Sequence, residues 1–201
     1  MVPETLTSDI AGCRAAHEVL AVRIAKLDDA AARAPSLLPD WTRAHVLSHL
    51  ARNAEAMVRR VDARQRGELI EQYEGGQQGR LADIAVGAVR PAATLIEDVL
   101  AWSTRLESTF ASLTNDCWAL PVRSVAGGTH PIAELPFRRW REVEVHLVDL
   151  NIGFSPADWS SALVERALPR LLPALAARTD PRVLMAWTLG RGLPPVLTPW
   201  G

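Results

Sequence analysis

Three residues near position 145 combine side chains that hold divalent metal ions in proteins. Glu142 and His146 are four positions apart, and Asp149 follows three positions later. At the helical repeat this spacing places all three on one face. Leu135 and Leu150 flank them on that face, so the polar groups point toward an apolar interior. A carboxylate and an imidazole buried there each need a partner or a metal ion, and either Asp149 or Glu144, which lies on another face, is a candidate to orient a ligand imidazole.

A second helical segment supplies a further candidate ligand. At about 100° per residue, His49 lies about 60° and Asn53 about 20° from Val46, so both polar side chains fall within the core-facing stripe. Together with Glu142 and His146, His49 would complete a His/His/Glu set. Such a set leaves the fourth position on zinc open for water or a thiolate. The alternative is a buried Glu–His ion pair without a metal ion.

Three further polar residues are candidates for binding or structural roles. His17 lies in the apolar seam of the first predicted helix and faces the same interior, either as a cofactor contact or as a core histidine. Asn53 is the second candidate cofactor contact. Arg191 stands beside glycines in AWTLGRG, where a guanidinium can hold a substrate carboxylate by two parallel hydrogen bonds; the alternative is an exposed arginine. Arg139 shares the inward side of its helix and is a candidate partner for Glu142.

The spacing of apolar residues predicts the elements that position these side chains. We expect four long helices, over residues 6–31, 41–67, 95–113 and 131–150. Asp40 is the predicted N-cap of the second helix. Pro136 predicts either a kink in the fourth helix or a later start. The sequence therefore indicates a mainly α fold built on a four-helix bundle.

The segments between and after these helices are less regular. Residues 71–80 are expected to form a polar loop, 81–90 a short helix, and 118–130 a hairpin around two glycines. Beyond residue 153, Pro169 and Pro173 interrupt a helical pattern. Residues 183–187 fit a strand or a helical turn, and an irregular tail follows. We therefore expect a helical domain over 1–153 and a small α/β or irregular C-terminal extension over 154–201.

Composition excludes several classes of protein. The 201 residues include 22 basic and 23 acidic side chains, and this balance removes the main driving force for nucleic-acid binding. No apolar run approaches the ~18 residues of a membrane span, and the first ten residues lack a secretory signal. We therefore expect a cytoplasmic protein. Cys13 and Cys117 form no metal-binding or redox motif and are expected to be a reduced, buried pair.

Four segments in order, WTRAHVLSHLARNAEAM, YEGGQQGR, RWREVEVHLVDLNIGF and AWTLGRG, resemble the mycothiol-dependent maleylpyruvate isomerase family. The resemblance spans roughly residues 5–155 and implies a DinB-like metal-binding four-helix bundle. The family's zinc ligands fall on His49, Glu142 and His146, the residues that helical spacing had selected. Its carboxylate-binding arginine falls on Arg191. The segment over residues 155–190 is shorter than in characterised members.

The resemblance implies an isomerase that converts maleylpyruvate to fumarylpyruvate in gentisate catabolism, using Zn²⁺ or another divalent metal and mycothiol. Zinc would lower the pKa of the thiol, and the thiolate would add to the cis double bond. Rotation and elimination would then give the trans isomer. The implied partners are an unsaturated keto acid and a low-molecular-weight thiol, acting on a monomer or homodimer.

Two alternative functions remain open at this point. Relatives of the family join mycothiol to other electrophiles, so a zinc-dependent mycothiol S-transferase is the first alternative. The second is a non-catalytic helical metal-binding protein that retains the site as a vestige.

Overall fold

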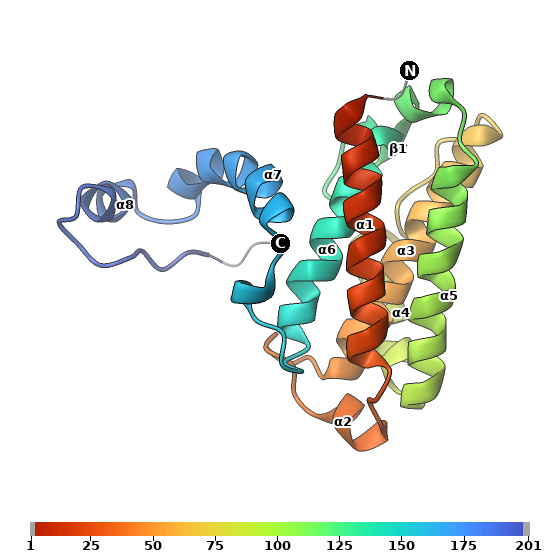
Figure 1. The fold of residues 1–201 in the computed structure, drawn as a ribbon, viewed down its shortest axis with the longest axis horizontal. Coiled ribbons are helices and arrows are strands. Elements are labelled where there is room, and N and C mark those ends of the chain that lie inside the picture. The colour runs from red at the N-terminus through yellow and green to blue at the C-terminus, as the bar shows by residue number, and fades with distance from the viewer. Residues whose placement is uncertain (1–2, 199–201) are drawn as a thin grey trace. The chain divides into compact units, whose positions relative to one another are not determined.

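The computed structural model describes residues 3–198, and four long helices dominate it (Figure 1). These are α1 (Glu4–Ile24), α3 (Arg43–Gln65), α5 (Ala92–Ala111) and α6 (Leu135–Asp149). Both α1 and α3 pack against α5 and α6, and α3 also packs against the shorter α4 (Gly76–Ala88). The predicted mainly α bundle is therefore confirmed.

Helix α3 lies at the centre of the bundle, because four other helices, α2 (Asp29–Arg33), α4, α5 and α6, contact it. Its apolar residues, including Val46, Leu50, Ala54 and Val61, are fully buried. Small alanines along the helix let its neighbours approach closely. The same packing buries His49 between α3 and α6, so the helix that forms the core also carries a predicted ligand.

The first predicted helix is divided in two. Helix α1 ends at Ile24, and a separate short helix, α2, covers Asp29–Arg33. Asp28 starts α2 as its N-cap, since its side chain accepts a hydrogen bond from the Ala31 backbone N–H at 2.8 Å. The single helix expected over 6–31 was therefore wrong, because a local capping interaction competes with the continued apolar spacing.

Thr42, not Asp40, is the N-cap of α3, so the predicted N-cap was wrong. Asp40 has a left-handed backbone with φ 62° and lies in the preceding turn. The backbone N–H of Thr42 donates to Nδ1 of His45 at 3.2 Å, while the Thr42 side chain accepts from the backbone of the helix's third residue. This reciprocal cap sets the start of the helix that carries His49.

Helix α4 begins inside the segment predicted to be a loop over 71–80. The loop ends at Gly75, whose φ of 69° is left-handed, and Gly76 starts the helix. A Cβ on Gly79 would lie 1.7 Å from the Glu74 carbonyl oxygen, so only glycine permits this tight first turn. The glycines that indicated a loop instead allow a helix to start abruptly.

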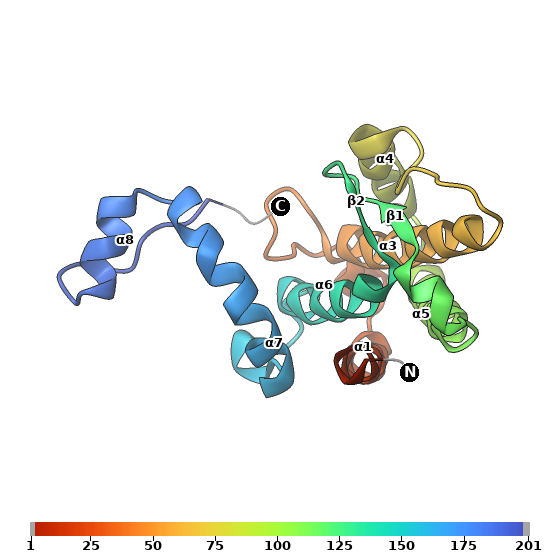
Figure 2. The same cartoon turned by 90° about the horizontal axis from the view of Figure 1, so that it is seen from above.

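A short antiparallel hairpin pairs β1 (Pro121–Arg123) with β2 (Thr129–Pro131), as predicted around the two glycines. Strand β1 contacts α3, and both elements can be seen from above in Figure 2. A 3₁₀ turn over Ile132–Glu134 follows, and α6 then starts at Leu135. Pro136 lies in the first turn of α6, where its missing N–H removes no helical bond. The proline therefore marks a later start and not a kink.

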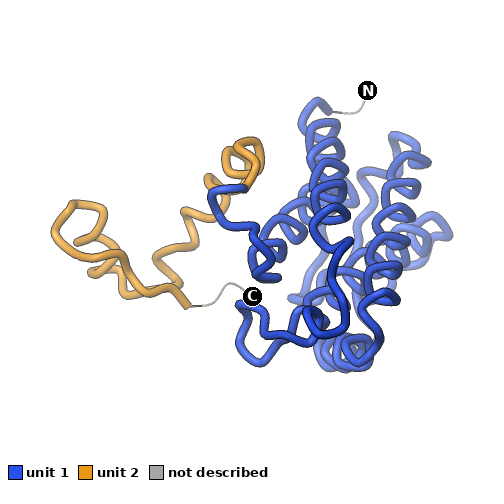
Figure 3. Tube along the Cα trace, turned by 60° about the horizontal axis from the view of Figure 1, so that its bottom comes forward, with its two compact units in different colours: residues 1–158 blue, residues 159–201 orange. Residues whose placement is uncertain are grey.

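The chain divides into two compact units, residues 1–158 and 159–201 (Figure 3). The second contains α7 (Ser161–Leu171), a 3₁₀ segment (Leu172–Ala177) and α8 (Pro181–Thr188). Helix α7 continues through Pro169, and residues 183–187 are helical. No strand occurs between residues 159 and 198, so the extension is helical and irregular. The predicted domain boundary after residue 153 stays a prediction.

Among the helices formed by residues 3–198, none combines the length and the apolar character needed to cross a bilayer.

Candidate metal centre

Helices α3 and α6 bring His49, Glu142 and His146 together at one point. Nε2 of His49 lies 3.1 Å from Nε2 of His146 and 3.2 Å from Oε2 of Glu142. The third distance, between His146 Nε2 and Glu142 Oε2, is 3.5 Å, so the three donor atoms form a small triangle. Glu142 and His146 are neighbours because they are one helical turn apart, whereas His49 arrives through the packing of α3 against α6. We call these three residues the triad.

The triangle formed by the triad's donor atoms has the size of a zinc coordination site. Bonds of about 2.0–2.1 Å at tetrahedral angles place two ligand atoms roughly 3.3–3.4 Å apart, close to all three sides of this triangle. His, His and Glu are also ligands that zinc accepts at catalytic sites with an open fourth position. The residues present therefore fit a zinc-sized divalent ion.

Asp149 holds one triad imidazole in the orientation that metal binding requires. Nδ1 of His146 donates to the Asp149 carboxylate at 2.8 Å, which leaves Nε2 directed at the other two ligands. Burial lowers the pKa of His146, but hydrogen bonds to Asp149 and Glu142 outweigh burial and raise it to about 9. Without a metal ion, His146 is therefore an imidazolium at neutral pH.

The other two triad residues respond differently to their surroundings. Burial lowers the pKa of His49 to about 4, although the hydrogen bond to Glu142 opposes this shift. Burial raises the pKa of Glu142, but hydrogen bonds from His146 and His49 outweigh burial and hold it well below its ordinary value. At neutral pH the triad therefore contains a neutral His49 and an ionised Glu142.

Two residues that the sequence reasoning did not select also contact His49. The Trp41 ring lies edge-on to the imidazole, with ring centroids 5.9 Å apart. Nη2 of Arg80 lies 3.3 Å from Nδ1 of His49. Both residues fall in segments that carry the family resemblance, WTRAHV and QQGR, which was the available signal.

The Arg80 contact constrains the tautomer of His49. A guanidinium only donates, so Nδ1 of His49 must accept and the ring proton must sit on Nε2. Metal binding through Nε2 requires the opposite tautomer, with the proton on Nδ1. The Arg80–His49 hydrogen bond and metal binding by His49 therefore exclude each other.

Arg139 lies at the centre of a second polar cluster, which contains the two predicted cofactor contacts. This arginine is fully buried, and its Nε donates to Nε2 of His17 at 3.0 Å. One terminal nitrogen donates to Asn53 Oδ1 at 3.1 Å and to the Leu50 carbonyl at 2.8 Å, and the other donates to Ser103 Oγ at 3.3 Å. These acceptors hold the guanidinium, and among residues 3–198 Arg139 makes no ion pair with Glu142. The expected partnership is limited to a longer-range attraction, since burial lowers the pKa of Arg139 and the Glu142 charge opposes this shift.

His17 completes this cluster by contacting a carboxylate at its other ring nitrogen. Nδ1 of His17 donates to Glu107 at 2.8 Å, so both ring nitrogens have partners within the bundle. Asn53 has its oxygen engaged by Arg139, while its side chain also borders a cavity shared with Glu142. The cofactor-binding roles of His17 and Asn53 stay predictions.

Arg191 belongs to the second compact unit and is exposed. Its guanidinium donates to the carbonyls of Leu189 and Gly190 at 3.3 and 3.4 Å. The bundle that forms the triad therefore does not by itself position this arginine, and its catalytic role stays a prediction.

Both cysteines are free thiols, but only one is fully buried. Burial raises the pKa of the Cys13 thiol to about 12, so it is not a nucleophile at neutral pH. Cys117 is half-buried, in contrast to the expected buried pair.

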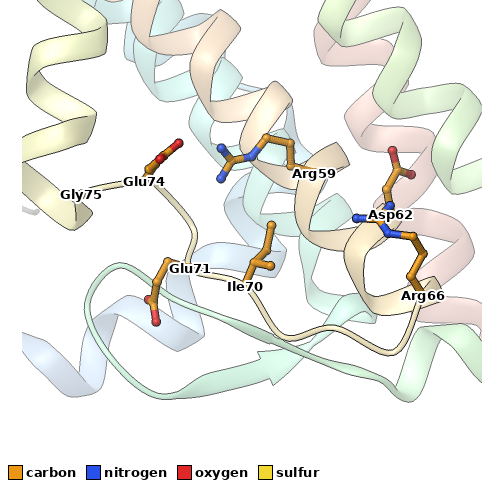
Figure 4. Close-up of a pocket in the computed structure, with 7 residues that line it drawn as sticks. All are labelled: Arg59, Asp62, Arg66, Ile70, Glu71, Glu74 and Gly75. Carbon is orange, nitrogen blue, oxygen red and sulfur yellow. The ribbon is translucent and has the colours of Figure 1, made fainter.

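A cleft of about 540 Å³ lies on another part of the bundle, away from the triad (Figure 4). It is lined by the end of α3 and the loop that follows, and Arg59 and Glu74 extend into the same space. Arg59 is ten residues beyond His49 on α3, or about 15 Å along the helix axis. Charges of both signs line this cleft, and the triad does not contribute to it.

Comparisons with known proteins show which family this chain belongs to. The family model for the mycothiol maleylpyruvate isomerase N-terminal domain matches residues 13–151. A crystal structure of a mycothiol-dependent maleylpyruvate isomerase superposes with a TM-score of 0.76 at 26% sequence identity, covering 82% of this chain and 67% of that chain. The crystal structure of a histidine-to-alanine mutant of that isomerase gives the same values. No curated protein matches. The matched region contains the whole triad, and this chain belongs to the mycothiol maleylpyruvate isomerase N-terminal domain family.

Proposed function

We propose that this protein is a metal- and mycothiol-dependent isomerase that converts maleylpyruvate to fumarylpyruvate. The observation that carries the proposal is the convergence of three donor atoms, from His49, Glu142 and His146, within 3.5 Å of one another. The solved structures that this chain resembles are named as isomerases of this kind, which supplies the substrate and the thiol.

His49, Glu142 and His146 would hold the metal ion, with zinc as the proposed ion. When bound, zinc supplies a positive charge that lowers the pKa of a thiol, so that a thiolate forms at neutral pH. Asp149 fixes the His146 tautomer, and the apolar packing around His49 limits access of water. The chain therefore contributes an oriented ligand set in which His49 is buried and Glu142 and His146 are partly exposed.

The chemistry proposed is addition followed by elimination. The thiol sulfur forms a bond to one carbon of the cis double bond, and the electron pair moves toward the conjugated carbonyl. The resulting carbon–carbon single bond rotates, and loss of the thiol restores the double bond in the trans form. No protein cysteine takes part, which agrees with the high pKa of the buried Cys13 thiol. Arg191 is the proposed contact for a substrate carboxylate.

Metal analysis combined with an isomerase assay tests this proposal. The purified wild-type chain is expected to contain about one zinc ion per chain and to isomerise maleylpyruvate only with mycothiol. His49→Ala and Glu142→Gln should each lose zinc and activity together. Glu97→Gln, which neutralises an exposed carboxylate on α5 away from the triad, serves as the matched control for Glu142→Gln. Activity that persists in a metal-free variant would contradict the mechanism.

A zinc-dependent mycothiol S-transferase is the second candidate. The observation that favours it is the triad itself, because a thiolate formed beside a metal ion can add to other electrophiles as well. Mass spectrometry of the zinc protein with mycothiol and a panel of unsaturated keto acids separates the two functions. Conjugates without isomers would favour the transferase, whereas fumarylpyruvate without stable conjugates would favour the isomerase.

A further inference from the structure

A cavity of about 60 Å³ adjoins the triad and shares Glu142 with it. On α3, the lining residues Asn53, Met57 and Arg60 follow His49 by 4, 8 and 11 positions, so they continue the helix face that carries this ligand. The other walls come from α6, the hairpin and the loop before α4. They are formed by Arg138, Arg141, His130 and Gln72.

The charged groups around this cavity are mostly cationic. Arg60, Arg138 and Arg141 face one carboxylate, that of Glu142. A second carboxylate, that of Glu134, forms an ion pair with Arg138 at 2.8 Å but does not line the cavity. Burial lowers the pKa of His130, so this side chain is neutral at pH 7. Because Glu142 is directed at the two triad imidazoles, the remaining surface of the cavity is positive.

Arg60 is the most unusual of these cations, because it is only 2% exposed. Its Nε donates to the Ala56 carbonyl at 3.1 Å, and Nη1 donates to the Arg123 carbonyl at 2.6 Å. Among residues 3–198, no carboxylate lies within ion-pair distance of its guanidinium. Backbone carbonyls hold Arg60 in place without neutralising it, and an uncompensated buried charge is costly.

Asn53 supplies a second donor to the same cavity. Its Oδ1 accepts a hydrogen bond from Arg139. Because a guanidinium can only donate, the oxygen of the Asn53 side chain, and not its NH₂ group, must face Arg139. The side-chain NH₂ therefore faces away from Arg139. No described residue accepts a hydrogen bond from this NH₂. The cavity thus combines a buried cation with a hydrogen-bond donor whose orientation is fixed.

We propose that this cavity is an anion subsite in which Arg60 and Asn53 bind one carboxylate of the molecule that reacts at the triad. The identity of that molecule rests on the proposed function. Maleylpyruvate carries two carboxylates, and the subsite would take one of them. The space equals that of about two water molecules, which suits a carboxylate group. Guanidinium and amide N–H groups are the donors that such a group prefers.

Binding of maleate to the zinc-loaded full chain, without thiol, tests this subsite by isothermal titration calorimetry. Arg60→Met removes the charge while keeping the aliphatic stem, and should weaken maleate binding at least about tenfold. Asn53→Asp keeps an oxygen for Arg139 but replaces the donor with a second acceptor, so it should weaken binding similarly. Neutral maleamide should bind the wild type and both variants with equal affinity.

Arg64→Met is the matched control, because Arg64 lies on the same helix and also donates to backbone carbonyls but does not line the cavity. It should leave maleate affinity unchanged. Zinc content and thermal unfolding are measured for each variant. If Arg60→Met does not fold, Asn53→Asp decides the outcome, since it preserves the Arg139 contact. Unchanged maleate affinity in Asn53→Asp, or in a folded Arg60→Met, would overturn the proposal.

The subsite and the proposed function fail in different ways. Maleate binding that depends on Arg60, in a chain that does not isomerise maleylpyruvate, would refute the isomerase and leave the anion subsite standing. Isomerisation with an unchanged KM in both variants would refute the subsite and leave the isomerase standing.

Discussion

Two histidines of this bundle have similar hydrogen-bond partners at Nδ1 and different partners at Nε2. His17 and His146 each direct Nδ1 at a carboxylate 2.8 Å away, Glu107 in the first case and Asp149 in the second. At Nε2 the surroundings diverge. Nε2 of His17 accepts a hydrogen bond from Arg139, whereas Nε2 of His146 faces another imidazole and the carboxylate of Glu142.

This difference separates a structural cluster from a candidate metal site. Around His17, both ring nitrogens and the guanidinium of Arg139 have hydrogen-bond partners, so the hydrogen bonding of the cluster is complete. In the triad, three groups that can all act as acceptors converge, and only protons or a cation can hold them together. The pKa values reflect this contrast, since burial lowers that of His17 whereas two carboxylates raise that of His146. Burial of a histidine alone is therefore a poor indicator of function.

Breaking the complete cluster should have the largest effect on stability. Arg139→Met removes the donor that four buried acceptors share and is expected to lower the free energy of unfolding by about 3–5 kcal/mol. Urea denaturation measures this change. Arg138→Met, which removes a partly exposed arginine of the same helix that pairs with Glu134, should change stability by less than about 1 kcal/mol. A folded Arg139→Met chain that still binds zinc would show that the two clusters are separable, while equal stability losses would contradict the comparison.

The two carboxylates that orient the histidines should differ in what they support. Asp149→Asn is expected to weaken zinc binding about 10- to 100-fold, because it removes the negative charge beside Nδ1 of His146 and introduces an NH₂ group that can favour the opposite His146 tautomer. Glu107→Gln should leave zinc affinity unchanged and reduce stability instead, by about 1–2 kcal/mol. Competition with a chelator measures the first quantity and urea denaturation the second. Comparable zinc affinities in the two variants would mean that Asp149 does not orient a ligand.

The raised pKa of His146 predicts how zinc binding depends on pH. Below about pH 9 a proton occupies His146 in the metal-free chain, and zinc must displace it. Because raising the pH removes this competitor, zinc affinity should increase about tenfold per pH unit up to that pKa, with about one proton released per ion. Calorimetry in buffers of different ionisation enthalpy counts the proton. Affinity that does not vary with pH would mean that His146 is neutral before zinc binds.

The smallest expected effect belongs to Arg80. Its hydrogen bond to Nδ1 of His49 stabilises the tautomer that does not bind metal through Nε2. Arg80→Met should therefore raise zinc affinity by several fold, about 0.5–1.5 kcal/mol for one hydrogen bond. Arg90→Met, on the segment after the same helix, is the control and should leave zinc affinity as in the wild type. Weaker zinc binding in Arg80→Met would show that Arg80 supports the site instead of competing with it.

The sequence predicted the long helices and the inward face of α6, because apolar spacing and one-turn pairs depend only on the helical repeat. It failed at Asp28, Thr42 and Gly79, where capping or a close backbone approach sets the ends of helices. These interactions involve single side chains and leave no periodic signal.

Sequence alone determined that Glu142 and His146 share a face, since both belong to one helix. Whether His49 meets them depended on how α3 packs against α6, and that packing brings three donor atoms within 3.5 Å. The partners of Arg139 and the cavity beside Glu142 were likewise decided only by tertiary structure. Local periodicity fixes which way a side chain points, whereas the groups it meets belong to segments that are distant in the chain.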